Sequence, residues 1–455
     1  MRKRTNTLLN DGMFNRNKVN NIKRFYKEGE FTLKDTTAIL FHYSHSAFIY
    51  KALNSLKNIE SRVKSIIVLQ ERRMSPIKWS KKLEIVISDG NDNGNLLNDM
   101  IGNVTTPYVI FLHEEDYLSP TVHPDTLILP NTKSVIGTYY YNRNIVIEFP
   151  VFIRTSLLKQ EKLLPLTQLP FRESFLPAWF ASIEPGQIIM KENLIRQSSM
   201  NRSATTIEKE SIMQKYQKPV HKSKQLTISV VIATYNMEKY IETAVVSCLL
   251  QTEMFDQILI MDDGSTDGSD QKLEQLANEK QVKIFHKKNE GKAKALNELL
   301  PHVTSDFILE LDADDWLDAD ACSVIKKHLS NLPEEVAVLY GNLRKWKQKT
   351  KDILFKTTSK GVVIKEIAAL LSYQFPLGPR IYKTSILKEE GGFPVLDFED
   401  GRLYEDVSVL HQLLKKYSFC YKDFTVYNVR EHQKSITKNN ESKWQTFLQM
   451  LKSQK

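Results

Sequence analysis

Residues 258–267 read ILIMDDGSTD, and residues 307–315 read FILELDADD. Each stretch is a short apolar run that ends abruptly in carboxylates. A run of this length is typical of a parallel strand that helices cover on both faces. Its carboxyl end then lies at the rim of the sheet, where open α/β sheets bind ligands. The two acidic rims predict one site for a cation and a polar, phosphorylated ligand.

The rest of the chain repeats this alternation of apolar runs with segments of helical spacing. Runs of strand length fall at residues 38–41, 65–69, 83–87, 108–112 and 228–233. Strands that alternate with helices predict an α/β fold built on parallel sheets.

Changes in composition divide the chain into five segments. They are a basic N-terminal arm (1–34), a first α/β domain (35–200), a polar linker (201–225) with room for a helix near residues 208–216, a second α/β domain (226–435) and a C-terminal helix (436–455). The last helix is expected because Trp444, Phe447, Leu448 and Leu451 share one helical face.

Composition and charge narrow the class of protein. The 455 residues are 41% hydrophobic and 26% charged, with a diffuse net charge of +9. No basic motif with interleaved aromatic residues occurs, so we expect no nucleic-acid partner. Cys248, Cys322 and Cys420 fit neither a metal knuckle nor a redox motif, which favours a reducing, cytoplasmic location. No run reaches the length of a membrane span, so any membrane contact is expected to be peripheral.

An internal repeat links the two halves. VTTPYVIFLHEEDYL (104–118) parallels VTSDFILELDADDWL (303–317), and FIRTSLL (152–158) parallels IYKTSIL (381–387). Several matches in the same order predict two copies of one fold.

Asp312 and Asp314 are the sharper chemical signal in the second copy. Side chains two positions apart on a strand point the same way, so both carboxylates could face one ligand. Mg²⁺ and Mn²⁺ prefer such oxygen ligands. The alternative is a helix start capped by aspartate.

A calcium loop is a rival interpretation of the first acidic rim. The residues at its ligand and glycine positions would be Asp263, Ser265, Asp267, Gly268 and Glu274. The polar Asp270 stands where such a loop packs an apolar side chain, and the preceding segment has the pattern of a strand rather than a helix. Both features argue against calcium.

Five motifs follow one another in the second copy. They are VVIATYN (230–236), QT (251–252), DDGSTD (262–267), NEGKAKALN (289–297) and DADD (312–315). This ordered set resembles the family 2 glycosyltransferases, inverting enzymes with the GT-A fold, a Rossmann-like nucleotide-diphospho-sugar transferase fold. The resemblance covers about residues 225–435 and extends weakly to spore-coat polysaccharide glycosyltransferases. It implies tandem GT-A domains, of which the first is divergent.

The resemblance implies a nucleotide pocket. Asp263 matches the carboxylate that binds the base, usually uracil. Thr234, Tyr235 and Asn236 match the turn that lines the nucleotide, and Asp312 matches the aspartate near the ribose and donor sugar.

It also implies a metal site beside the donor. Asp314 matches the residue that holds a divalent cation, Mn²⁺ or Mg²⁺, on the diphosphate. His432 matches a closing segment that can contact the metal or the diphosphate, with a lone surface histidine as the alternative. Lys292 lies in the region that lines the donor site, although a solvated helix lysine explains it as well.

The segment LYEDVSVLH (403–411) resembles the acidic motif of the same family. Asp406 then matches the general base that takes the proton of the acceptor hydroxyl, and Glu405 aids acceptor placement. The alternative is a helix with an acidic first turn.

The first copy departs from the pattern at each of these places. HEED (113–116) replaces DADD, Gln70 and Glu71 fall near the place of Asp262 and Asp263, and Ser174 stands at the base position. Glu115 retains a carboxylate for a metal. We therefore expect an inactive copy.

The expected activity is transfer of a hexose or aminosugar from a UDP donor, with dTDP or GDP as alternatives, to a glycan hydroxyl in cell-surface or spore polysaccharide synthesis. A homodimer and a contact with polysaccharide-assembly proteins stay open. One rival is a non-catalytic glycan-binding or assembly scaffold. A nucleotidyltransferase is the other, but it would need a glycine-rich basic loop where Thr234–Glu238 stands.

Overall fold

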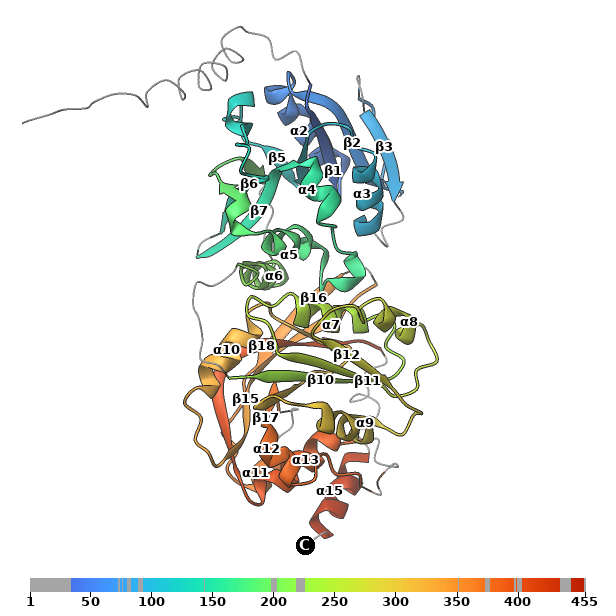
Figure 1. Ribbon diagram of the computed structural model, residues 1–455, viewed down its shortest axis with the longest axis vertical. Coiled ribbons are helices and arrows are strands. Elements are labelled where there is room, and N and C mark those ends of the chain that lie inside the picture. The colour runs from blue at the N-terminus through green and yellow to red at the C-terminus, as the bar shows by residue number, and fades with distance from the viewer. Residues whose placement is uncertain are drawn as a thin grey trace, which may run out of the picture.

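The computed structural model contains two α/β units stacked along its long axis (Figure 1). We call residues 34–197 the N-terminal unit and residues 226–433 the C-terminal unit. The structure describes residues 34–453 apart from residues 73, 76, 80–82, 89–92, 143, 198–202, 218–225, 351, 373–376, 397, 399–402 and 434–442. The expected basic arm lies outside the described residues except for Lys34.

The described part of the N-terminal unit contains a seven-stranded sheet with the strand order β3-β2-β1-β4-β7-β6-β8. Its strands are β1 (Thr36–Phe41), β2 (Val63–Glu71), β3 (Leu83–Ser88), β4 (Tyr108–His113), β6 (Val135–Asn142), β7 (Ile145–Arg154) and β8 (Ile188–Met190). A separate ribbon pairs β5 (Asp116–Leu118) with β9 (Ile195–Gln197).

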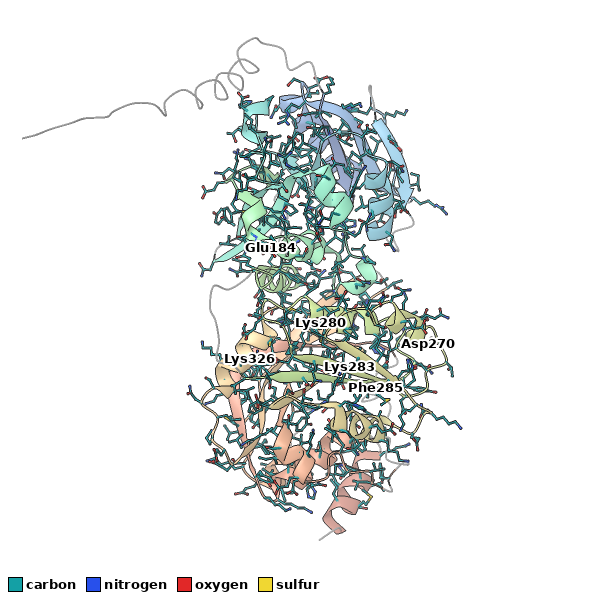
Figure 2. All side chains as sticks on the ribbon, viewed as in Figure 1. Glu184, Asp270, Lys280, Lys283, Phe285 and Lys326 are labelled. Carbon is teal, nitrogen blue, oxygen red and sulfur yellow. The ribbon has the colours of Figure 1, made fainter. Side chains whose placement is uncertain are left out.

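The C-terminal unit contains a nine-stranded sheet in the order β12-β11-β10-β13-β17-β15-β18-β14, with β16 beside β15. Its strands are β10 (Ile228–Thr234), β11 (Gln257–Asp262), β12 (Val282–His286), β13 (Phe307–Glu310), β14 (Trp316–Leu317), β15 (Val336–Gln348), β16 (Ile353–Ser359), β17 (Arg380–Lys383) and β18 (Ser418–Glu431). The edge strand β12 carries Lys283 and Phe285 (Figure 2). Charge on an edge strand discourages pairing with another sheet.

Helices cover both sheets. The α-helices are α2 (Ser46–Ser55), α3 (Asn93–Gly102), α4 (Thr155–Gln160), α5 (Phe175–Ser182), α6 (Ala204–Gln214), α7 (Ile241–Leu249), α8 (Ser269–Glu274), α9 (Lys292–Leu299), α10 (Ala321–Leu329), α11 (Ile367–Ser372), α12 (Thr384–Glu389), α13 (Glu405–Leu414) and α15 (Trp444–Ser453). Short 3₁₀ turns are η1 (Leu56–Ile59), η2 (Pro124–Leu127), η3 (Leu166–Gln168), η4 (Arg172–Ser174), η5 (Pro185–Gln187) and η6 (Leu300–His302). The predicted α/β class is confirmed, and α15 lies within the expected C-terminal segment (436–455).

Alternation along β10 explains the layers. Val230 and Ile232 pack against α7 and α10 on the side that faces the N-terminal unit, whereas Val231 packs against α9 and α12 on the opposite side. Buried apolar side chains cover both faces of the sheet, and for this reason β10, β11 and β13 appear in the sequence as nearly continuous apolar runs.

The two sheets share their strand order. In each, the first strand pairs in parallel with the second and fourth, and the second with the third. Next come the antiparallel strands β7 and β6 in one sheet and β17 and β15 in the other. β18 alone makes the pairings that β8 and β9 divide between them.

The segment expected to be a linker contains a packed helix. α6 begins four residues before the expected helix and lies between the units (Figure 1). Its Ile212 and Met213 join an apolar cluster with Phe171 of the N-terminal unit and Trp316 and Trp346 of the C-terminal unit. The segment has the polar composition of a linker because some of the residues that the helix buries, Lys209 and Glu210, are charged.

Within the described part of the chain, no helix has the length and apolar character to cross a membrane.

Candidate active site

The carboxyl ends of three neighbouring strands meet at one edge of the C-terminal sheet. β10 lies between β11 and β13 and is parallel to both. Thr234 at the end of β10 pairs with Asp262 at the end of β11, and β13 ends two residues before Asp312. The two predicted acidic rims therefore lie on either side of the turn after β10, where the strand order reverses.

Asp263 lies at this edge but binds the protein's own backbone. Its Oδ1 accepts the N–H of Glu290 at 3.0 Å, and its Oδ2 accepts the N–H of Gly291 at 2.8 Å. Gly291 has a φ of +97°, a conformation that favours glycine. Each carboxylate oxygen keeps a second lone pair, so a base or ribose group could still bind there.

The turn after β10 divides its predicted nucleotide residues between two roles. The Thr234 hydroxyl is buried and has no hydrogen-bond partner, and the Tyr235 side chain is 44% exposed. Asn236 has a φ of +56°, and its Oδ1 accepts the N–H groups of Thr266 at 2.7 Å and Asp267 at 3.3 Å. Asn236 therefore ties two loops together, Tyr235 is exposed to a ligand, and the Thr234 hydroxyl lies unpaired beneath the turn.

This loop also delays the first helix of the unit. Residues 238–250 have helical apolar spacing, but α7 begins only at Ile241, because the N–H of Met237 donates to Ser269 Oγ and that of Glu238 donates to Asp267 Oδ2. Asp267 Oδ1 accepts the N–H of Ser269. These side-chain oxygens are occupied by backbone donors and follow a strand, which excludes the calcium-loop interpretation.

Lys292 lies at the centre of an ion-pair cluster, and the interpretation as a solvated helix lysine is wrong. Its Nζ is 2.9 Å from Glu310 Oε1, 3.0 Å from Glu405 Oε1 and 2.5 Å from Asp312 Oδ1. Burial disfavours the ammonium, but these carboxylates raise the pKa of Lys292 well above its usual value. Lys292 stays charged and joins the end of β13 to the start of α13.

Arg380 is a second cation in the cluster, which the sequence did not reveal. Its Nε and Nη2 each lie 2.9 Å from an oxygen of Glu310, and Tyr382 donates to the same carboxylate at 3.0 Å. Burial raises the pKa of Glu310, but Arg380 and Lys292 hold it well below its usual value. The signal was Glu310 itself, because a carboxylate inside an apolar strand needs a buried partner.

Glu405 and Asp406 begin α13, as predicted, directly after an unusual residue. Tyr404 has a φ of +60°, which is rare for a bulky side chain. Its ring centroid lies 5.2 Å from that of Trp444 and 4.6 Å from that of Phe447 on α15. The C-terminal helix thus packs on the residue that orients the acidic pair.

The two acidic residues face different partners. Glu405 binds Lys292, and burial raises its pKa although Lys292 opposes the effect. Asp406 Oδ1 accepts the N–H of Val407 at 2.8 Å, and its Oδ2 lies 3.7 Å from Arg380 Nη1. The Asp406 side chain is 23% exposed. Asp406 is thus fixed in orientation but open on one side, as a general base must be.

Asp314 and His432 meet at the far side of the same edge. His432 Nε2 is 2.9 Å from Asp314 Oδ2, and the imidazole stacks on Tyr240 with a centroid distance of 4.7 Å. The backbone N–H of Arg430 donates to Asp315 Oδ1 at 2.7 Å. His432 is only 8% exposed, so it is not the lone surface histidine that the sequence left open.

The donor set fits a divalent cation that substrate oxygens help to hold. Among the described residues, no group of three or more His, Cys, Asp and Glu side chains is placed to bind a metal. Asp314 and His432 together offer one carboxylate and one imidazole. Burial, reinforced by Asp314 and Asp312, raises the pKa of the adjacent Asp315 well above its usual value. Mg²⁺ is commonly held by one or two carboxylates plus phosphates and water.

The corresponding edge of the N-terminal unit has different groups. We aligned the two sheets by the register of their first, second and fourth strands. In this alignment Glu71 takes the place of Asp263, His113 that of Asp312 and Glu115 that of Asp314. His113 Nδ1 is bound to Asp116 Oδ2 at 2.6 Å. Ser174, expected at the base position, is buried and donates to the carbonyl of Phe171 at 2.6 Å.

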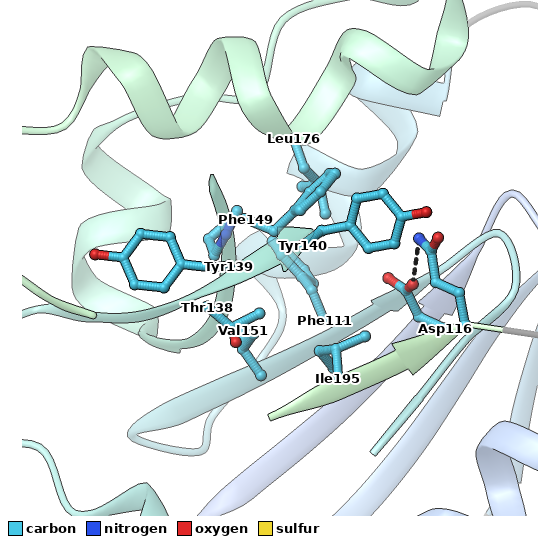
Figure 3. A pocket seen from close by; sticks show the side chains of 11 residues that line it. Phe111, Asp116, Thr138, Tyr139, Tyr140, Phe149, Val151, Leu176 and Ile195 are labelled. Carbon is cyan, nitrogen blue, oxygen red and sulfur yellow. Dashed lines mark hydrogen bonds between the residues drawn. The ribbon is translucent and has the colours of Figure 1, made fainter. Parts of the chain in front are cut away.

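A cavity of about 20 Å³ lies between the β6–β7 hairpin, α5 and β9, and Asp116 accepts a hydrogen bond from Gln197 on its wall (Figure 3). That volume holds roughly one water molecule.

Comparisons with known proteins bear on the C-terminal unit. Residues 229–387 match the family model described as Glycosyl transferase family 2. An uncharacterized glycosyltransferase of Haemophilus influenzae is 29% identical over 217 residues, which cover 47% of this chain and 82% of that protein. One of Rickettsia conorii is 30% identical over 168 residues, or 37% of this chain. The chain spans 27% of the length of the relatives from Rickettsia conorii and Rickettsia felis.

A likeness to a solved structure covers a similar share. The crystal structure of S. aureus TarS 1–349 in complex with UDP has a TM-score of 0.35 at 22% identity, covering 45% of this chain and 61% of that one. The matched family region spans β10 to α12 and holds Asp263, Lys292, Asp312 and Asp314. Residues 229–387 are therefore similar to the glycosyl transferase family 2 proteins.

Proposed function

We propose that residues 226–435 are the catalytic domain of a metal-dependent, inverting glycosyltransferase with the GT-A fold. It moves a hexose or aminosugar from a nucleotide-diphosphate donor, with UDP as the favoured nucleotide, to a hydroxyl group of a glycan. The observation that carries the proposal is the bridge from Asp312 through Lys292 to Glu405, because it joins the predicted donor side to the predicted acceptor side. The family match supports the reaction class.

In this proposal the donor nucleotide lies against the turn after β10. Asp263 is immobilised by two backbone N–H groups and uses its remaining lone pairs for the base or ribose. Thr234 supplies an unpartnered hydroxyl and Tyr235 an exposed ring. Asn236 acts indirectly, since its amide group fixes the loop at Thr266.

Asp406 is proposed as the general base. Its carboxylate takes the proton of the acceptor hydroxyl while that oxygen forms a bond to the anomeric carbon of the donor. The bond from this carbon to the diphosphate oxygen breaks on the opposite face, and its electron pair leaves with the nucleoside diphosphate, so the configuration inverts. Arg380 orients Asp406, and Glu405, held by Lys292, positions the acceptor.

Asp314 would hold the divalent cation, Mn²⁺ or Mg²⁺, with His432 beside it. When bound, such a cation neutralises the charge that develops on the departing diphosphate. Asp312 stays on Lys292 in this arrangement and faces the ribose and donor sugar.

We further propose that residues 35–200 are a divergent, inactive GT-A-like copy, and that residues 201–225 connect it to the catalytic domain. The shared strand order and the repeated motifs support a common origin. The replaced carboxylates support the loss of activity. Residues 1–34 would form a basic arm, and residues 436–455 the C-terminal helix.

The setting is proposed from the sequence. We assign the reaction to cell-surface or spore polysaccharide synthesis in the cytoplasm, by a protein that contacts the membrane or assembly proteins peripherally and is able to form a homodimer. Such a protein must meet a growing glycan, and this is the acceptor class that the proposed chemistry requires.

Thermal unfolding in the presence of UDP-, dTDP- and GDP-sugars, with and without Mn²⁺, tests the function. We expect one donor class to raise the Tm only when Mn²⁺ is present. Asp406→Asn should keep that stabilisation and lose sugar transfer. A protein that responds to no donor, with or without metal, would instead be the glycan-binding scaffold.

A further inference from the structure

The interface between the two units contains buried charges as well as apolar contacts. Lys209 of α6 is 3% exposed and bridges the units, because its Nζ lies 2.9 Å from Glu173 of the N-terminal unit and 2.7 Å from Asp352 of the C-terminal unit. Glu208 lies in α6 and Lys215 directly follows it. The ion pairs of both residues, described next, are with the C-terminal unit.

Glu208 and Lys215 belong to a second ion-pair network, centred on Asp318. This carboxylate is fully buried. Lys215 Nζ lies 2.7 Å from its Oδ2, and Arg344 Nη1 lies 2.9 Å from both oxygens. Glu208 accepts a hydrogen bond from Arg344 Nε at 2.5 Å. Two residues of the connecting segment thus hold a cation and an anion of the C-terminal unit in one arrangement.

The Asp318 network reaches the two segments that carry the proposed metal ligands. Asn428 of β18 donates to Asp318 Oδ1 at 2.7 Å and to the carbonyl of Trp316 at 3.3 Å. β14, which contains Trp316, separates Asp318 from Asp314 and Asp315. The pairing of β14 with β18 is only two residues long, so these side chains supply much of its support.

From Asn428, β18 continues directly into the site. The N–H of Arg430 donates to Asp315 Oδ1 at 2.7 Å, and its Nε donates to the Asp314 carbonyl at 2.9 Å. His432 follows and meets the Asp314 side chain. A shift of Asp318 would therefore move both partners of the Asp314–His432 pair relative to each other.

Charged groups at this place are informative because they are not needed for stability alone. Replacing a buried ion network by apolar side chains of similar volume is often neutral or stabilising. The network provides a fixed geometry, because the contacts of Arg344 and Lys215 together hold the Asp318 carboxylate in one orientation. Groups that orient metal ligands in this way commonly change metal affinity when they are altered.

We infer that Glu208 and Lys215 are positioning residues, through which α6 fixes the geometry of the Asp314–His432 pair. The readout in metal affinity rests on the proposed function, whereas the geometric claim stands on the contacts alone. The connecting segment then does more than join the two units: it braces the metal side of the C-terminal unit.

The test uses the full-length protein with Lys215→Met, Glu208→Gln and, as rescue, Lys215→Arg. We expect the apparent KM for Mn²⁺ in sugar transfer to rise about 10-fold or more in the first two variants, the range typical of groups that support metal ligands. The donor KM at saturating Mn²⁺ should stay unchanged, and Lys215→Arg should restore the KM for Mn²⁺. If Lys215→Met fails to fold, Glu208→Gln decides, because Lys215 stays in place while Arg344 loses its anionic partner and its hold on Asp318 loosens.

Lys209→Met is the matched control. It removes a buried lysine from the same helix and interface, but this lysine pairs with Glu173 and Asp352 rather than with Asp318. We expect its KM for Mn²⁺ to equal that of the wild type. Equal increases in Lys209→Met and Lys215→Met would mean that α6 only docks the units, and unchanged values in Lys215→Met and Glu208→Gln would also overturn the inference.

Hydrogen exchange gives a readout that does not depend on activity. The amide of Arg430 is bound to Asp315 Oδ1, and we expect it to exchange faster in Lys215→Met and Glu208→Gln but not in Lys209→Met. If the wild type transfers no sugar from any donor, the proposed function fails and the exchange experiment still decides the inference. Unchanged exchange in the first two variants would overturn it.

Discussion

His432 Nε2 lies 2.9 Å from Asp314 Oδ2, although 118 residues separate the two along the chain. The contact joins the end of β18 to the acidic segment after β13. It creates a carboxylate–imidazole pair at the edge of the sheet where we propose that the diphosphate binds.

The first prediction concerns this pair. Asp314→Ala should abolish the Mn²⁺-dependent part of the donor-induced rise in Tm, and His432→Ala should weaken Mn²⁺ without abolishing its effect, because the carboxylate remains. Thermal unfolding over a range of Mn²⁺ concentrations with a fixed nucleotide-sugar measures both effects. His286→Ala is the control, since that imidazole is 52% exposed and lies beside Asp262 instead. Full Mn²⁺ dependence in Asp314→Ala would contradict the assignment.

The second prediction separates the two acidic residues at the start of α13. Asp406→Asn should lower kcat by about 10²–10⁴, the usual contribution of a general base, and leave the donor KM unchanged. Glu405→Gln should raise the acceptor KM, because its bond to Lys292 helps to position the acceptor side. Steady-state kinetics with varied donor and acceptor distinguish the two. Asp423→Asn is the control, because Asp423 of β18 forms an exposed pair with Lys360, and it should leave kcat and both KM values unchanged. A larger loss of kcat in Glu405→Gln than in Asp406→Asn would reverse the roles.

The third prediction concerns stability. Glu310→Ala should lower the free energy of unfolding by roughly 3–5 kcal/mol, because it leaves Arg380 and Lys292 buried without their shared carboxylate. Urea denaturation of the purified protein measures this loss. Lys294→Met is the comparison, since Lys294 of α9 forms an exposed pair with Glu290, and its replacement should leave the free energy of unfolding nearly unchanged. Similar losses in the two variants would show that the cluster is not a buried unit.

The fourth prediction concerns pH and the N-terminal unit. Burial raises the pKa of Glu114 from its ordinary value to about 7. Between the ordinary value and about 7, the folded protein therefore binds more protons than the unfolded protein, and this residue's contribution to stability falls as the pH rises. Glu114→Gln should remove that loss and gain roughly 3 kcal/mol over the wild type on going from pH 4 to pH 8.

Urea denaturation of both proteins across this pH range measures the difference. Burial lowers the pKa of the neighbouring His42, an effect of opposite sign, but this histidine is present in both proteins and largely cancels. A pH-independent difference between wild type and Glu114→Gln would show that the carboxyl group is not buried in solution.

The sequence predicted those parts of the site that depend on local order. Asp263, Asp312 and Asp314 follow strands whose apolar runs are unmistakable, and the carboxyl ends of parallel strands must share an edge. Glu405 and Asp406 were likewise recognisable as the acidic start of a helix. These positions follow from patterns a few residues long.

The pairing within the site could not be predicted in the same way. Lys292 meets Glu405, and Arg380 meets Glu310, only because α9, β17 and α13 converge on one edge. Such contacts depend on how the elements pack, and a lysine at the start of a helix has the same local sequence whether it is buried or solvated. Arg380 was missed for this reason.

α6 was underestimated for a related reason. Its residues are polar enough for a linker, yet Lys209 and Glu210 are almost fully buried. A polar residue is expected at the surface unless its partner is known. The partners of Lys209 are Glu173, which precedes α6 in the sequence, and Asp352, which follows it by more than a hundred residues. Only the assembled interface accounts for this composition.

The shared strand order of the two sheets has a consequence for synthesis of the chain on the ribosome. In each sheet the first strand must wait for the fourth, whose paired residues emerge 72 residues later in the N-terminal unit and 79 residues later in the C-terminal unit. Such non-local parallel pairing is slow and leaves apolar edges exposed meanwhile. Neighbouring domains of like topology are prone to exchange strands. Because the N-terminal unit emerges first, it can close its sheet before β10 and β11 appear, and this order of emergence reduces the opportunity for mispairing.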